Sequence, residues 1–146
     1  MELIKFDNVS FSYQTTDEKD NPVSIPVLKD FNLSIEQGSF VAILGHNVSG
    51  KSTVAKLTNG ILFADSGTVT VNGKVAKNDD SIYDIRRDAG TVFQNPDNQI
   101  VSSIVEEDVA FGVENLGVPA DECRKRVDDA LKTVGMYEYR LKTPSK

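Results

Sequence analysis

The chain has 146 residues, which is the size of one ordinary domain. Hydrophobic residues make up 39% and charged residues 26%, so we expect a packed core and not a disordered chain. The net charge of −6 argues against nucleic acid as the main partner, because such binding depends on Lys and Arg neutralising phosphates.

Nothing in the sequence predicts a membrane span or a secreted protein. No apolar run reaches eighteen residues, and the stretch from Met1 to Lys5 lacks the basic and apolar regions of a signal peptide. Cys123 is the only cysteine, which excludes an internal disulfide framework and a paired-cysteine metal site. Together these features predict a cytosolic protein.

The N-terminal third predicts two strands and a loop between them. Apolar residues alternate from Leu3 to Tyr13, which predicts a strand with a bulge near Asn8. The polar stretch from Thr15 to Pro26 contains two prolines, so we expect a surface loop there. The strand pattern then resumes from Leu28 to Ile35.

The next segment predicts a strand, a loop and a helix. Phe40 to Leu44 is a continuous apolar run, which is typical of a strand buried on both faces of a parallel sheet. A loop from Gly45 to Gly50 follows. Ser52 to Asn59 has a helical pattern, and Gly60 is expected to end that helix.

Short elements are expected in the middle of the chain. The turn Asn72-Gly73 follows the strand pattern from Thr68 to Val71 and indicates a hairpin. Ser81 to Asp88 predicts a short helix with Ser81 as its N-cap, and Gly90 to Phe93 predicts another buried strand.

The last third is predicted to be helical. We expect helices over Ile104 to Leu116 and over Ala120 to Val134. The second should bury one apolar face, which comprises Cys123, Val127, Ala130, Leu131 and Val134.

One motif carries specific chemistry. The segment from Gly45 to Ser52 fits the pattern G-x-x-x-x-G-K-[ST] of phosphate-binding loops, and it lies between a predicted strand and a predicted helix. Such a loop aims backbone N–H groups and a helix dipole at a polyphosphate. Lys51 adds a positive charge, and the hydroxyl of Ser52 is a suitable Mg²⁺ ligand.

Several motifs together resemble the ABC-type ATPases. Gly45 to Thr53 resembles their phosphate loop, Phe11 to Tyr13 their aromatic loop, and Asp65 to Gly73 their β-subdomain signature. Val92 to Ile100 is similar to the glutamine loop of ATPase subunits in energy-coupling factor importers, and Val105 to Gly112 continues that match.

The resemblance implies an α/β fold. It implies a phosphate-loop core with mainly parallel strands, an antiparallel β-subdomain built from the N-terminal strands, and part of a helical subdomain. On this basis residues 1–146 form the N-terminal part of a nucleotide-binding domain. Residues 1–95 would be the core with the β-subdomain, and residues 96–146 the start of the helical subdomain.

The resemblance also implies a role for individual residues in binding ATP and Mg²⁺. Tyr13 would stack on the adenine, Lys51 would hold the phosphates, and Ser52 and Gln94 would contact Mg²⁺. Lys51 and Gln94 are the expected catalytic residues. The remaining nucleotide contacts would come from the loop and the start of the helix: Gly45, Asn47, Val48, Ser49, Gly50 and Thr53.

The partners implied by the resemblance are membrane-bound. They are a second ATPase subunit, identical or related, a transmembrane coupling subunit and a substrate-binding membrane subunit. The ATPase pair would sit on the cytoplasmic face of the membrane and drive import.

Two departures from the family pattern keep other functions open. Val48 stands where the family has glycine, at a position expected to favour φ > 0, where a β-branched residue is strained. We also expect the chain to lack the signature motif, the Walker B strand and the switch histidine, and to be inactive alone. The alternatives are a non-hydrolysing nucleotide-binding or interaction module and, less well matched beyond Pro96, a small-molecule kinase.

Overall fold

The computed structural model describes residues 1–77 and 79–144. They fall into two compact units, residues 1–91 and residues 92–146.

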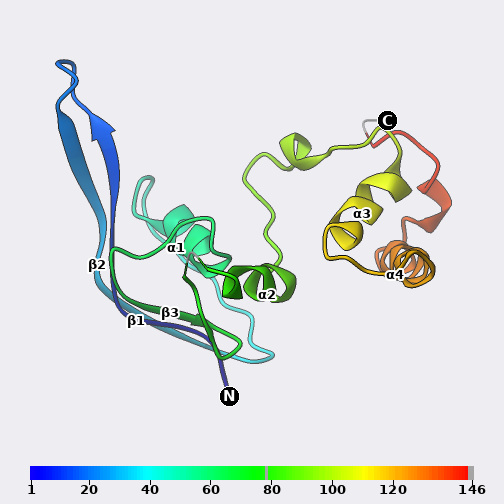
Figure 1. Cartoon of the computed structure of the whole chain (residues 1–146), viewed down its shortest axis with the longest axis horizontal. Coiled ribbons are helices and arrows are strands. Elements are labelled where there is room, and N and C mark those ends of the chain that lie inside the picture. Colours follow the sequence, from blue (N-terminus) through cyan, green and yellow to red (C-terminus); the bar gives the residue numbers. More distant parts are fainter. Residues whose placement is uncertain (78, 145–146) are drawn as a thin grey trace. The chain divides into compact units, whose positions relative to one another are not determined.

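The first unit contains a four-stranded antiparallel sheet in the order β2-β1-β3-β4 (Figure 1). The strands are β1 (Glu2–Thr16), β2 (Pro22–Glu36), β3 (Ser66–Val71) and β4 (Lys74–Val75). β1 pairs with β2 along its whole length but with β3 only from Ile4 to Ser10. The outer halves of β1 and β2 therefore project beyond β3 as a two-stranded hairpin.

The loop predicted from Thr15 to Pro26 is wrong, because most of these residues are in strands. Pro22 pairs with Thr16 and Pro26 with Ser12, which extends β2 almost to the hairpin tip. β2 is an edge strand, and an edge tolerates proline because one side of the strand needs no donor N–H.

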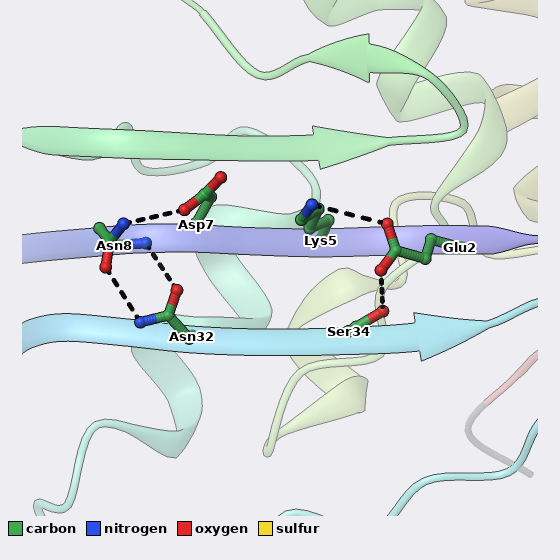
Figure 2. A network of polar contacts seen from close by, with 6 residues as sticks. All are labelled: Glu2, Lys5, Asp7, Asn8, Asn32 and Ser34. Carbon is green, nitrogen blue, oxygen red and sulfur yellow. Dashed lines mark hydrogen bonds and ion pairs between the residues drawn. The ribbon is translucent and has the colours of Figure 1, made fainter.

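The bulge predicted near Asn8 is confirmed. The pairing register shifts between Phe6 and Val9, and Asn8 has a φ of 49°. The side-chain amide of Asn32 on β2 accepts from the backbone N–H of Asn8 at 2.9 Å and donates to the Asn8 side-chain oxygen at 3.2 Å (Figure 2). The Asn32 side chain therefore accepts from a backbone N–H group at the bulge, where the regular hydrogen bonding between the strands is interrupted.

Two helices complete the first unit. α1 (Lys51–Thr58) and α2 (Ser81–Asp88) form where the sequence predicts helices, although Asp80 and not Ser81 is the N-cap of α2. Their buried side chains join those of the sheet in one core. Its buried members are Phe6, Val9, Phe11, Leu28, Val54, Leu57, Val69, Val71, Ile82 and Ile85.

The two predicted buried strands do not form. Residues 40–44 and 90–93 lie outside any helix or strand, and Phe40 is 99% exposed. An apolar strand of a parallel sheet needs a neighbour on each side and cover on both faces. The described residues place no strand beside either segment, so nothing holds them in extended pairing.

The second unit is helical, as predicted. It comprises η1 (Pro96–Gln99), α3 (Val105–Glu114), α4 (Ala120–Thr133) and η2 (Tyr137–Tyr139). α4 buries Cys123, Val127 and Leu131 against α3. The expected burial of Ala130 and Val134 is wrong, because both are exposed. None of the helices in the described part of the chain is long and apolar enough to span a membrane.

Candidate functional site

Glycines shape the loop between residues 45 and 50. A Cβ added at Gly45 would lie 2.6 Å from the Ser49 hydroxyl oxygen, so a side chain there would collide with the other side of the loop. Gly50 has a φ of 87° and is the N-cap of α1. Its missing side chain lets the loop pass against Val27 and Leu28 of β2. The loop path therefore requires glycine at position 50, whereas a side chain at position 45 would displace the hydroxyl of Ser49.

Lys51 places its ammonium group across the loop. Its Nζ atom donates to the carbonyl oxygens of Gly45 at 2.8 Å and His46 at 2.7 Å, and it lies 3.3 Å from the Ser49 hydroxyl. The loop is thus folded around one positive charge. An ammonium held in this way presents a compact charge to a polyphosphate.

The start of α1 adds further donors. Gly50 offers no side chain to cap the helix, so no side-chain capping bond is made. The N–H groups of the first helical turn, Lys51 to Thr53, have no intrahelical partner by geometry. Together with the helix dipole they form an anion-binding end, and the exposed Ser52 hydroxyl lies within the same turn.

Val48 has the strained backbone that the sequence predicts. Its φ is 67°, a value that β-branched residues rarely adopt, and its side chain is 98% exposed. Because so little of this side chain is covered, apolar burial offsets little of the strain. Asn47, the residue before it, is also exposed.

A cavity of about 350 Å³ opens beside the loop, and we refer to it as the loop cavity. Its volume falls in the range of small-molecule sites. It joins the predicted phosphate-binding residues to the predicted base-stacking Tyr13, whose hydroxyl lies 3.2 Å from the Thr53 hydroxyl. The lining residues are Tyr13, Ile25, Val27, Val48, Ser49, Gly50, Lys51, Ser52 and Thr53.

Two lining residues were missed in the sequence. Ile25 and Val27 stand on β2, within the stretch that we expected to be a loop. The alternation of Val23, Ile25 and Val27 is the signal that indicates a strand, but the flanking prolines masked it. Ile25 pairs directly with Tyr13 across the sheet, so the two side chains share one face.

Other cavities fit a nucleotide less well. A space of about 370 Å³ shares Ser49, Gly50 and Lys51 with the loop cavity, but neither Tyr13 nor Ser52 lines it. In the second unit, a cavity of about 200 Å³ has Glu106, Glu107 and Glu114 in its lining, and these carboxylates would repel a polyphosphate.

The remaining predicted site residue is Gln94. It is exposed and lies in the second unit, just before η1. Its role toward Mg²⁺ stays a prediction.

The residues present fit a nucleotide bound with Mg²⁺. The described residues contain no group of three His, Cys, Asp or Glu side chains that could hold a metal ion. A phosphate loop needs no such group, because the hydroxyl of Ser52 would help to hold a metal that the nucleotide itself brings to the site.

Solved structures define the class to which this fold belongs. The chain is similar to cbiO1 from Clostridium perfringens, described as part of the ABC transporter complex cbiONQ, with a TM-score of 0.79 and 37% identity. The match covers 97% of this chain and 54% of that one. A dimeric ATP-binding cassette in a post-hydrolysis state with ADP and Pi matches with a TM-score of 0.76 and 28% identity, over 97% of this chain and 62% of that one. The fold is therefore that of an ABC ATPase, which confirms the predicted class.

The family follows from sequence. The family model described as ABC transporter matches residues 28–146, and the chain belongs to this family. Among curated relatives, the energy-coupling factor transporter ATP-binding protein EcfA1 of Caldanaerobacter subterraneus is 56% identical over 138 residues, which is 94% of this chain and 48% of the relative. The EcfA1 protein of Clostridium novyi is 51% identical over 142 residues, 97% of this chain and 49% of the relative. The chain thus spans about half the length of these relatives.

Proposed function

We propose that the loop cavity binds Mg-ATP, and that the protein is the ATP-binding subunit of an energy-coupling factor importer. The observation that carries the proposal is the arrangement around Lys51. Its ammonium group is bound by carbonyl oxygens of the loop and lies at the start of α1, where no side chain caps the helix. The loop and the helix start line the same cavity as Tyr13.

Each lining residue has a role in this proposal. Lys51 and the amides of the first turn of α1 hold the phosphates, and Ser52 supplies a hydroxyl ligand for the metal. Tyr13 offers a flat ring to the base, with Ile25 extending the apolar surface. Gln94 is assigned to the metal or the attacking water. Residues 1–95 act as core and β-subdomain and residues 96–146 as part of the helical subdomain.

The partners are proposed from the relatives. Those relatives are named as ATP-binding proteins of energy-coupling factor transporters, and one solved neighbour belongs to a complex named cbiONQ. We infer that a second ATPase subunit, identical or related, pairs with this one. The pair would bind a transmembrane coupling subunit and a substrate-binding membrane subunit at the cytoplasmic face of the membrane.

Hydrolysis needs more than the loop cavity provides. Among the described residues that line it, none is a carboxylate that would serve as general base for water. We infer that residues 1–146 bind the nucleotide but do not hydrolyse it alone. A non-hydrolysing nucleotide-binding module is the second candidate, and the strained Val48 at the loop crest favours it.

Titration of the full chain with Mg-ATP, followed by calorimetry, tests the proposal. Lys51→Ala should weaken binding about 10- to 100-fold, because a charge-assisted contact with the phosphates is lost. Lys56→Ala is the matched control, since Lys56 lies on the same helix but outside the lining of the loop cavity, and it should change affinity less than about twofold. A folded protein that ignores ATP, or equal effects of the two variants, would refute the proposal.

A further inference from the structure

One hydrogen bond joins the two ends of the loop cavity. The hydroxyl of Tyr13, on β1, lies 3.2 Å from the hydroxyl of Thr53, in the first turn of α1. The residues are 40 positions apart in sequence. Thr53 is only 3% exposed, whereas Tyr13 is 36% exposed and lines the cavity.

The Tyr13 ring is thereby held at two points. A second contact is with Phe11, whose ring is 5.0 Å away in an edge-to-face arrangement at 89°. Phe11 is buried in the core and fixes one part of the tyrosine ring. The hydroxyl contact with Thr53 fixes the tip, so the ring direction is set jointly by the sheet and by the helix that follows the loop.

We propose that Thr53 is a positioning residue for Tyr13, and that it orients the ring on which the nucleotide base stacks. The inference rests on the proposed function, because it assigns Thr53 an effect on base recognition in that same cavity. A ring free to turn about its side-chain torsions loses entropy when a base stacks on it. A ring that is already held loses less, so the hydrogen bond should strengthen base binding.

This role differs from a direct contact between Thr53 and the phosphates. A phosphate contact would act on any polyphosphate, with or without a base, and would not depend on the hydroxyl of Tyr13. A positioning role acts only on ligands that carry a base, and it disappears when either hydroxyl is removed. The two roles therefore give different patterns of affinity.

The experiment measures Mg-ATP and inorganic Mg-tripolyphosphate binding to the full chain. Thr53→Val and Tyr13→Phe each remove one hydroxyl with little change in shape, and the double variant completes a cycle. Each single variant should weaken ATP binding about three- to tenfold, the loss expected for one hydrogen bond. The double variant should lose no more than either single one, and tripolyphosphate affinity should stay within about twofold throughout.

Three further variants serve as a rescue test and as controls. Thr53→Ser keeps the hydroxyl and should restore most of the ATP affinity. Thr58→Val removes a hydroxyl from the same helix that bonds only the backbone of Val54, and Tyr83→Phe removes one from an exposed ring of α2. Both controls should bind ATP like the parent protein.

Distinct results would overturn each level of the inference. Additive losses in the double variant, or an equal loss of tripolyphosphate affinity, would assign Thr53 to the phosphates and refute the positioning role. Unchanged ATP affinity in Tyr13→Phe would refute the positioning role as well. If Thr53→Val fails to fold, Tyr13→Phe still tests the role, because it removes the other hydroxyl of the same hydrogen bond. A parent protein that binds neither ligand would refute the proposed function itself, and the positioning role with it.

Discussion

The two units of the chain are stabilised in different ways. In residues 1–91, ten buried apolar side chains from the sheet, α1 and α2 form one core. In residues 92–146, the corresponding cluster has three buried members: Cys123, Val127 and Leu131. Since apolar burial is the main favourable term in folding, the first unit has much the stronger internal basis for stability.

The elements of the second unit are also joined by polar contacts. Arg124 of α4 pairs with Glu106 of α3 at 3.2 Å and with Asp128 at 3.3 Å. The backbone N–H groups of Val105 and Glu106 donate to carbonyls of the C-terminal segment, at residues 142 and 140. These ion pairs are only partly exposed, since the side chain of Arg124 is 53% exposed but those of Glu106 and Asp128 are 20% and 23% exposed. Their attraction is offset in part by the cost of desolvating the charges, so we expect them to fix geometry more than they add free energy. The loop cavity lies in the unit that has the firmer core.

The largest expected effect compares one core leucine from each unit. Leu57 is fully buried, and Leu57→Ala should lower the free energy of unfolding of the first unit by about 3–5 kcal/mol. Leu131→Ala should lower that of the second by about 2–3 kcal/mol, because its smaller cluster can relax around the gap. Urea unfolding of the full chain, followed by hydrogen exchange in each unit, measures both. Equal losses would contradict the difference between the cores.

A second comparison uses the glycine that follows a helix in each unit. Gly60 follows α1 with a φ of 67°, and an added Cβ would lie 1.8 Å from the Cδ1 atom of the buried Ile82. Gly135 follows α4 with a φ of 71° and has nothing within 4 Å of such a Cβ. Gly60→Ala should therefore cost about 2–4 kcal/mol, strain plus collision, and Gly135→Ala about 1 kcal/mol, strain alone. The melting temperature should therefore fall further in Gly60→Ala than in Gly135→Ala. Equal falls would contradict the denser packing around the glycine of the first unit.

Elements with a regular local pattern could be predicted from the sequence. The helical patterns predicted over residues 52–59 and 120–134 and the alternation in β1 and β3 led to the right elements, because each pattern marks an apolar face that the structure buries. The run Phe40 to Leu44 has equally clear apolar character. It does not form a strand, because a parallel strand depends on neighbours that its own residues cannot specify.

The candidate site was predicted unevenly for the same reason. The loop motif is local, so its glycines and Lys51 could be predicted from it. The positive φ at Val48 was expected because the family that the chain resembles has glycine at this position. The place of Tyr13 beside the loop came from resemblance to a family and not from any period in the sequence. Its bond to Thr53 depends on how β1 packs beside α1, and no local pattern indicates it.

A third prediction concerns Val48, whose backbone is strained although it lies in the unit with the larger core. Val48→Gly relieves about 1–3 kcal/mol of backbone strain, less about 0.5–1 kcal/mol for the greater freedom of glycine in the unfolded chain. The variant should therefore be up to about 2.5 kcal/mol more stable and should bind ATP more tightly. Val134→Gly is the control, because Val134 is also exposed but has a φ of −93°, and its change should only destabilise. Unaltered stability and ATP affinity in Val48→Gly would show that the loop carries no strain.

The smallest expected effect is a dependence of the first unit on acid. Asp88 of α2 accepts hydrogen bonds from the Asn72 amide at 2.9 Å and the Lys74 ammonium at 3.1 Å, and these contacts lower the pKa of its carboxyl below the ordinary 3.8. Because the folded pKa is the lower one, the contribution to stability is present above about pH 4 and is lost as the pH falls through the folded value.

Asp88→Asn should therefore lower the melting temperature slightly at pH 6, and its melting temperature should fall less than that of the parent between pH 5 and pH 2. Asp84→Asn removes a carboxylate from the same helix without touching the contacts of Asp88, and it is the control for the loss of one negative charge. If the melting temperature falls equally with pH in the parent and in Asp88→Asn, the contacts of Asp88 with Asn72 and Lys74 add nothing to stability. The first unit would then depend on its core alone.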